Sequence, residues 1–401
     1  MKLFRSLLIA PATIGLLAPL AASANEVNLN EISNFSNFAV ADVENIDHSD
    51  EEIFEIVNSF NESPELETLI AGGEGMAHDH ASDSFSATTS ASFSADMAIG
   101  SIDGQGTTST ITDGKEAVSF VYGYQIDLNT SFTGEDSLDI SIDAGNATAD
   151  TLGELDLNST GDDLQLDGVS YTFPIGGRTT VFVGDNMDGS TLYNTACLYG
   201  GITNTLDDCG NVESALGSGQ GTAAGASFDL GGGFTAALGY TGAGSSTSGL
   251  FTKESQDAGG AQLTYTGDSY GLSLTYATIE QAEGEGFDKS YTAINGYWSP
   301  EDSSLPSISV GYEQSDSEKW WKEESSTFFV GLQWDEFGPG TLGTAVGTAG
   351  HIDDNATEYY MYEAFYSYPL NDGVTITPVV YVKEAAAADE TGVMVKTSFS
   401  F

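Results

Sequence analysis

The side chains that could do chemistry in this sequence are few and scattered. Two of its four histidines flank an aspartate at His78-Asp79-His80. A zinc site needs three or four ligands, and no further ligand cluster accompanies this pair, so we prefer a solvated linker to a metal site. His351 precedes Asp353 and Asp354, but a Ser-His-Asp device would also need a nucleophile, and no nucleophile motif is present. We predict no enzyme, no cofactor and no metal.

The start of the sequence predicts export. Lys2 and Arg5 form a basic start, residues 7–20 form an apolar core, and Ala22-Ser23-Ala24 is a small-residue cleavage site. We assign residues 1–24 to a signal peptide. No other apolar run reaches the roughly 20 residues of a membrane helix, so any membrane span must consist of strands.

Only two cysteines are present, Cys197 and Cys209. In an exported chain their closeness predicts a disulfide that closes a short loop. The alternatives are free thiols and a metal site. A metal site would need further ligands nearby, and we find none.

The composition is strongly acidic, with a formal net charge of −50 from 10 basic and 60 acidic residues. This charge argues against nucleic acid and anionic surfaces as partners. The chain should nevertheless fold, because its 18 Tyr, 21 Phe and 4 Trp provide ample apolar area. The 48 Gly suit the tight turns of a β protein.

Residues 25–83 differ from the rest of the chain, because they are acidic and lack strand alternation. We interpret them as a periplasmic segment with one short helix at residues 50–60, in which Ile53, Ile56 and Phe60 have helical spacing. The alternative is a flexible acidic linker.

Apolar and polar residues alternate from Ser84 onward. Leu272 and Leu274, for example, oppose Ser273 and Thr275. One apolar face and one polar face are what the lipid-facing exterior and wet lumen of a transmembrane barrel require. We therefore predict an all-β, antiparallel up-and-down transmembrane barrel at residues 84–401. Its sixteen strands are predicted at 84–100, 116–132, 136–146, 164–173, 178–184, 222–231, 233–241, 258–267, 269–279, 289–299, 305–314, 325–334, 339–349, 358–369, 372–384 and 391–401.

The connections between these strands alternate between short and long. Short connections rich in turn residues, such as 231–233 and 267–269, alternate with longer polar ones, such as 147–163 and 242–257. Transmembrane barrels have short periplasmic turns and long external loops, so both termini are predicted in the periplasm.

The last predicted strand, residues 391–401, should pair with the strand from Ser84 and close the barrel. Phe399 and Phe401 share its apolar face with Val393 and Val395. We expect these two aromatic residues to face lipid at the periplasmic rim, where barrel-assembly machinery could read them.

The longest connection, residues 185–221, holds both cysteines. A barrel of this size leaves an open channel unless something narrows it, so we interpret this connection as a constriction loop that folds inward. The alternative is a stapled surface loop that folds outward.

Alternation places charged side chains on the inner wall and so predicts an acidic lumen that favours cations and neutral solutes. Two alternatives remain open. The carboxylates could merely solvate the wall while the loop alone sets selectivity, or the acidity could reflect a salty medium, where charge repulsion is screened. The predicted pore-lining residues are Asp96, Asp127, Asp139, Asp143, Glu313 and Glu363, with Arg178, Lys383 and Lys396 as the basic minority.

Tyrosines 360, 362, 366 and 368 share the face opposite Glu363. An interfacial girdle is the preferred interpretation, and a sugar-stacking track is the alternative. Trp320-Trp321 falls in a predicted external loop. These residues could pack between loops or protomers, or they could bind an external ligand.

Several segments resemble the carbohydrate-selective (OprB-like) porins. They are residues 327–335 (TFFVGLQWD), residues 363–378 (EAFYSYPLNDGVTITP) and the closing strand. The cyanobacterial branch of that family is most similar, and in it residues 85–93 (FSATTSASF) and 204–210 (NTLDDCG) also match. The resemblance implies a sixteen-stranded outer-membrane barrel, commonly trimeric, through which small hydrophilic solutes diffuse.

Two departures from this family limit the comparison. Members of the cyanobacterial branch usually carry an S-layer-homology domain and a coiled coil before the barrel, whereas residues 25–83 stand there in this chain, so a cell-wall tether is left open. Sugar-selective relatives use basic and acidic side chains at the eyelet, and Arg178 is the only arginine after the signal peptide. The function we predict is an outer-membrane porin, with outer-membrane lipid, small hydrophilic solutes and a homotrimeric assembly as partners. The alternative is a β-rich adhesin or structural protein without channel activity.

Overall fold

The structure is a computed structural model, and it describes residues 88–104, 117–148, 152–155, 157–211, 216, 221–244, 249–284, 287–301, 304–317, 324–354, 356–386 and 388–401. The predicted signal peptide, the helix at 50–60, His78-Asp79-His80 and Trp320-Trp321 lie outside these residues. None of the described helical segments has the length and apolar character that crossing a membrane demands.

The described residues form one antiparallel sheet. Its strands are β1 (Thr89–Asp103), β2 (Ser119–Thr130), β3 (Ser137–Gly145), β4 (Gln165–Ile175), β5 (Thr179–Met187), β6 (Gly221–Gly231), β7 (Phe234–Gly242), β8 (Asp257–Thr266), β9 (Tyr270–Glu280), β10 (Lys289–Trp298), β11 (Ser307–Ser317), β12 (Ser325–Phe337), β13 (Gly340–Thr348), β14 (Ile352–Asp353), β15 (Tyr360–Asn371), β16 (Val374–Lys383) and β17 (Glu390–Ser400).

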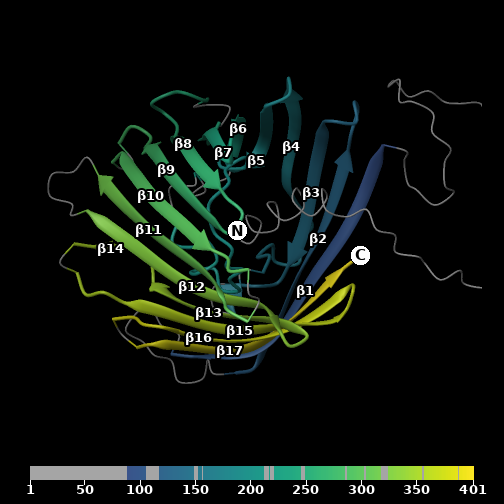
Figure 1. Cartoon of the computed structure of the whole chain (residues 1–401), viewed down its shortest axis with the longest axis vertical. Coiled ribbons are helices and arrows are strands. Elements are labelled where there is room, and N and C mark those ends of the chain that lie inside the picture. Colours follow the sequence, from purple (N-terminus) through teal and green to yellow (C-terminus); the bar gives the residue numbers. More distant parts are fainter. Residues whose placement is uncertain are drawn as a thin grey trace, which may run out of the picture. The chain divides into compact units, whose positions relative to one another are not determined.

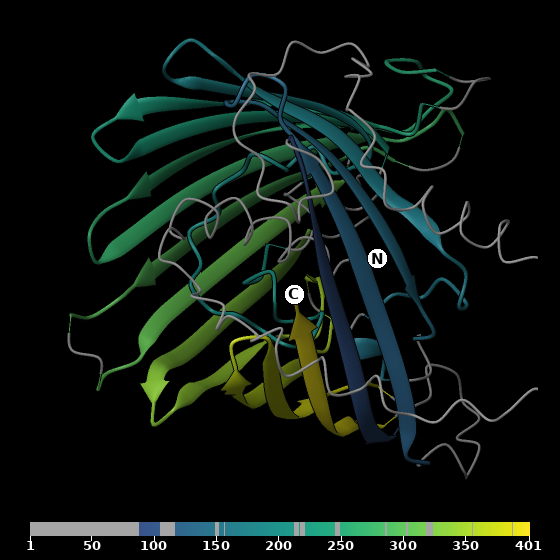
Figure 2. The same cartoon turned by 90° about the vertical axis from the view of Figure 1, so that its right-hand side faces the viewer.

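The sheet closes on itself as a sixteen-stranded barrel, which confirms the predicted fold. Consecutive long strands pair with each other, and β1 pairs with β17 along its length (Figures 1 and 2). At the seam the backbone N–H of Phe93 donates to the carbonyl oxygen of Phe401 at 2.9 Å, and the N–H of Phe401 donates back at 3.0 Å. The additional strand β14 has two residues and pairs only with the start of β12.

The two faces of the barrel wall have the opposite exposure to those of a water-soluble sheet. On β9, Leu272, Leu274 and Tyr276 are half-exposed, whereas Ser273 and Thr275 are buried. The apolar side chains therefore point outward and the small polar ones point inward, along the period-two pattern of a strand. An apolar exterior of this kind is stable only against a non-aqueous surrounding.

The connections alternate in length, as predicted. Tight turns follow β4, β6 and β8, and longer segments follow β3, β5 and β7. The β6–β7 turn uses Gly232 and Gly233, whose φ values of 64° and 85° lie in the left-handed region that glycine adopts without strain. The first and last strands both reach the end of the barrel that carries the tight turns.

The β2–β3 turn is organised by one carboxylate, that of Asp136. It accepts hydrogen bonds from the hydroxyl of Tyr171 at 2.6 Å, from the backbone N–H and hydroxyl of Thr133, both at 2.8 Å, and from the hydroxyl of Ser131 at 2.9 Å. The bond from Tyr171, followed by those from Thr133 and Ser131, holds the pKa of Asp136 well below its usual range.

This depressed pKa predicts a pH-dependent stability. Because the pKa is lower in the folded protein than the value of about 3.9 in an unfolded chain, the stabilisation is present above about pH 4 and is lost as the pH falls through the folded pKa. Asp136→Asn should therefore lower the apparent melting temperature of the detergent-solubilised protein at pH 7, with a difference from wild type that shrinks in acid. The exposed neighbour supplies the control, Glu135→Gln. If the difference in melting temperature between wild type and Asp136→Asn is the same at pH 7 as below about pH 4, the prediction is wrong.

Candidate functional site in the barrel lumen

The connection after β5 lies inside the barrel, against the polar face of the wall. Four of its backbone N–H groups donate to side chains of the wall strands β8, β9, β11 and β12. The donors and acceptors are Asn194 to Gln262 Oε1 on β8 at 2.6 Å, Ala196 to Ser273 Oγ on β9 at 2.9 Å, Leu198 to Ser309 Oγ on β11 at 2.9 Å and Gly200 to Gln333 Oε1 on β12 at 2.9 Å. Residues 194–200 therefore run across the inner face of the wall from β8 to β12.

Glu363 on β15 holds the far end of this crossing. Its carboxylate accepts a hydrogen bond from the hydroxyl of Tyr199 at 2.7 Å, and others from the N–H of Ile202 at 3.2 Å and the N–H of Thr203 at 2.6 Å. Glu363 is only 2% exposed. Burial, and then the nearby carboxylate, raise the pKa of Tyr199, so its hydroxyl stays protonated and donates.

The predicted disulfide between Cys197 and Cys209 is present and closes the loop at this position. Beyond it, the side-chain amide of Asn295 on β10 donates to the carbonyl oxygen of Cys209 at 2.9 Å. The wall carries glycine where the loop comes closest. A Cβ atom on Gly311 would lie 1.8 Å from the same carbonyl oxygen, and one on Gly331 would lie 2.7 Å from the Tyr199 ring.

A second inward segment comes from the β3–β4 connection, through the short 3-10 helix η2 (Gly153–Leu155). Glu154 accepts hydrogen bonds from Lys383 Nζ on β16 at 2.6 Å and from Thr205 Oγ1 at 2.9 Å. The Lys383 ammonium also donates to Thr205 Oγ1 at 2.9 Å. This network ties both inward segments to the wall.

An apolar core also lies within the lumen, which alternation alone did not predict. Leu152, Leu155 and Leu206 of the inward segments pack with inward wall residues such as Phe329 and Met361. A signal was present in the sequence, because Met361 and Phe365 oppose the outward tyrosines, so both faces of that strand are apolar. An inward apolar residue in a wet lumen would be costly, and its presence indicates that something covers it.

The predicted pore-lining carboxylates of β1 to β3 lie on the inward face. Asp127 accepts hydrogen bonds from Gln125 Nε2 at 2.6 Å and Ser141 Oγ at 2.7 Å. Asp139 accepts bonds from Asn129 Nδ2 at 2.6 Å and Ser137 Oγ at 2.7 Å.

Asp143 shares this inner wall and is 7% exposed. The β4 strand adds a carboxylate that we did not predict, Asp167, whose strongest charged neighbours include Asp143 and Asp127. The wall of β2 to β4 is thus acidic.

The predicted basic residues contribute little free positive charge to the lumen. Arg178 is exposed in the turn between β4 and β5, so the strand alternation used to place it inward does not apply, and that placement is corrected here. Lys383 is paired with Glu154. Lys396 lies 3.9 Å from Asp96, from Nζ to Oδ2.

His351 meets a carboxylate and a hydroxyl. Its Nε2 lies 2.7 Å from Glu313 Oε1 on β11, and its Nδ1 lies 3.2 Å from Ser325 Oγ on β12. Ser325 Oγ also lies 2.5 Å from Ser315 Oγ. These contacts fasten the β13–β15 connection to the wall. Glu313 is fully buried and faces this histidine rather than open lumen.

The predicted girdle tyrosines lie on the outer face. Tyr362 and Tyr368 are 43% and 38% exposed, whereas Glu363 points inward. A sugar-stacking track formed by these tyrosines would have to line the inner face, so this alternative does not apply to the lumen.

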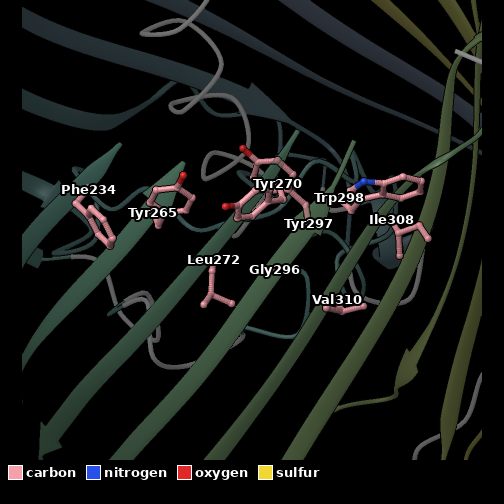
Figure 3. Close-up of a pocket in the computed structure, with 10 residues that line it drawn as sticks. Phe234, Tyr265, Tyr270, Leu272, Gly296, Tyr297, Trp298, Ile308 and Val310 are labelled. Atoms are coloured by element: carbon pink, nitrogen blue, oxygen red, sulfur yellow. The ribbon is translucent and has the colours of Figure 1, made fainter. Parts of the chain in front are cut away.

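A groove of ≈ 660 Å³ is present among the exposed apolar residues of β7 to β11. Figure 3 shows its aromatic and aliphatic lining, which includes Tyr270 and Leu272 of β9, Trp298 of β10 and Val310 of β11. Gly296 of β10 lies between Leu272 and Val310. These side chains are about half-exposed on the outward face. The groove is therefore separate from the polar lumen.

Solved porin structures share this fold. OprB of Pseudomonas putida, in a high-pH structure, matches with a TM-score of 0.54 at 10% identity, over 78% of this chain and 94% of that chain. A loop-deletion mutant of OmpT, an outer membrane protein of Vibrio cholerae, matches with 0.53 at 10% identity over 78% and 100%. A mutant porin of Rh. blastica matches with 0.50 at 14% identity over 78% and 100%. No family model matches, and no curated protein matches.

Proposed function

We propose that the chain is an outer-membrane porin through which small hydrophilic solutes and ions diffuse. The observation that carries this proposal is the closed barrel whose apolar face is outside and whose polar, acidic face encloses an inward loop. An adhesin without a channel would need its apolar strand faces packed on other protein layers, whereas Leu272 and Leu274 are half-exposed. The similarity to porin barrels supports the same conclusion at the level of fold.

The segment 185–221 serves as the constriction loop in this proposal. Its hydrogen bonds to β8, β9, β11, β12 and β15 support an inward position. The acidic residues of β1 to β3 then line the remaining lumen and favour cations and neutral solutes over anions. Arg178 lies in a turn, so a basic eyelet of the sugar-selective kind receives no support from it.

The cellular setting is also part of the proposal. Residues 1–24 direct export. The tight turns and both chain termini face the periplasm, and Phe399 and Phe401 present the assembly signal at that rim. Phe401 is 82% exposed and its ring stacks on Phe93 at 5.7 Å between centroids. We further propose a homotrimer and membership in the cyanobacterial OprB-like branch without an S-layer-homology domain.

Electrical recording from the purified protein in planar bilayers tests the function. Discrete conductance steps are expected, with a reversal potential in a salt gradient that indicates cation preference. Liposome swelling with sugars of graded size then measures the size limit. Absence of conductance from correctly folded protein would overturn the porin proposal, and anion preference would overturn the proposed selectivity.

A further inference from the structure

The groove on the outer face of β7 to β11 begins at the end of the barrel that carries the tight turns. Phe234 and Tyr270 each start a strand directly after such a turn, and Trp298 pairs with Tyr270. From this end the groove extends along the strands to Leu272 and Gly296 (Figure 3). Its ten lining residues are aromatic, aliphatic or glycine, and none of them is charged.

Gly296 forms the floor of this groove. It pairs with Leu272 on one side and with Val310 on the other, and a Cβ atom there would meet nothing closer than 3.4 Å. The volume of ≈ 660 Å³ lies within the range of roughly 300–1,000 Å³ that is typical of small-molecule pockets. A groove with an apolar floor on the outer face of a transmembrane barrel is suited to a hydrocarbon chain, which the surrounding lipid supplies.

A row of aromatic rings joins the groove to Arg178. The ring centroids of Phe234 and Tyr265 lie 4.9 Å apart, and those of Tyr265 and Tyr270 lie 5.5 Å apart. Phe234 pairs with Gly231, and a Cβ atom on Gly231 would lie 3.8 Å from Nη1 of Arg178. Because directly paired residues project from the same face of a sheet, the guanidinium group lies beside Phe234 on the outer face, at the aromatic end of the groove.

Arg178 is exposed and has no ion-pair partner among the residues that the structure describes. It is also the only basic residue in the described tight turns. The neighbouring carboxylate of Asp229 accepts a hydrogen bond from the backbone N–H of Gly231 at 2.8 Å instead. The acidity of the whole chain does not prevent an anion from binding here, because charges more than about 8 Å away are largely screened at physiological ionic strength.

We propose that the groove and Arg178 together bind one anionic phospholipid of the periplasmic leaflet. An acyl chain lies in the groove over Gly296, and the phosphate group accepts hydrogen bonds from the guanidinium fork of Arg178, which matches phosphate geometry. Tyr270 and Trp298 place a hydroxyl group and an indole N–H at the level of the headgroups, where such side chains are favoured. The inference goes beyond the proposed function, since it requires the barrel to lie in a bilayer but not to conduct.

Native mass spectrometry of the detergent-solubilised protein, equilibrated with equal amounts of phosphatidylglycerol and phosphatidylcholine, tests the site. We expect one retained lipid per chain, with phosphatidylglycerol preferred. Arg178→Gln should lower this preference about fivefold, which is the effect of one basic residue at a charged membrane surface, and should leave retention of phosphatidylcholine unchanged. Gly296→Leu should abolish retention of both lipids, because the new side chain fills the groove. Heat-modifiable migration on gels should show that each variant folds.

Two matched controls should retain phosphatidylglycerol as the wild type does. Lys253→Gln removes a basic charge from the exposed connection between β7 and β8, at the opposite end of the barrel. Thr292→Leu adds an apolar side chain to the outer face of β10 outside the groove.

Three outcomes would overturn the site. They are a wild type that retains no lipid or retains the two lipids equally, a control that loses as much lipid as its matched variant, and a Gly296→Leu protein that dissociates from a homo-oligomer while keeping its lipid. The last result would make the groove an interface between copies of the chain. Loss of conductance with selective lipid retention intact would instead count against the porin function alone.

Discussion

Gly311→Ala is expected to move the inward loop off β11 and to raise the single-channel conductance. The new methyl carbon would lie 1.8 Å from the carbonyl oxygen of Cys209 and 2.7 Å from the side-chain nitrogen of Asn295. A Cβ atom essentially never lies closer than 3.0 Å to a non-bonded heavy atom, so either the loop or the wall must move. The wall is held by hydrogen bonds on both sides of β11, so we expect the loop to move.

The matched control for this substitution is Gly296→Ala on the adjacent strand. Gly296 pairs with the outward residues Leu272 and Val310, and a Cβ atom there would meet nothing closer than 3.4 Å. Conductance in planar bilayers and the size limit in liposome swelling should increase only for the Gly311 variant. Heat-modifiable migration on gels should show that both barrels fold. Wild-type conductance in a folded Gly311→Ala protein would show that the loop is not seated against β11 in the membrane.

Glu363→Ala is expected to release the same loop at its other anchor. The substitution leaves the hydroxyl of Tyr199 and the backbone N–H groups of Ile202 and Thr203 without their acceptor. A buried donor without a partner costs roughly 1–3 kcal/mol. We therefore expect the three unpaired donors together to weaken the attachment of the loop to the wall by about 3 kcal/mol. A loss of about 3 kcal/mol would raise the detached population of the loop roughly a hundredfold.

Hydrogen exchange measures this release directly at the amides of Ile202 and Thr203. Exchange there should accelerate by a similar factor in Glu363→Ala, and open-channel current noise should increase. Glu363→Gln keeps one acceptor oxygen, so its exchange rate and current noise should lie between those of wild type and of Glu363→Ala. Tyr362→Phe, on the outward face of the same strand, should leave exchange and noise unchanged. If the amides of the Ala variant remain as protected as in wild type, Glu363 is not the anchor.

Both expectations concern a loop whose existence could be predicted from the sequence but whose path could not. The length of the connection and its two cysteines indicated a stapled loop, and the width of the barrel favoured an inward over an outward position without giving the path of the loop. The contacts that place it inward join residues far apart in the chain. Tyr199 and Glu363, for example, are 164 positions apart, and no local pattern relates them.

The acidic wall shows a second limit of local reasoning. Alternation placed Asp127 and Asp143 inward because it follows the strand period. It did not identify Asp167, since a bulge adds one residue and reverses the parity of the strand. It also misplaced Arg178, because a turn residue has no strand face. The change of apolar parity at 166–169 was visible in the sequence and could have revealed the bulge.

The sequence by itself determined the sixteen strands, their antiparallel order, the closing pair and the short and long connections. These features follow from period-two alternation and turn residues, which act over a few neighbouring positions. Only the tertiary structure decided where the loop lies, which carboxylate holds it and which lumen residues are covered by an apolar core. Those outcomes depend on wall side chains that the curvature of the closed barrel brings together, and the linear pattern carries no record of that proximity.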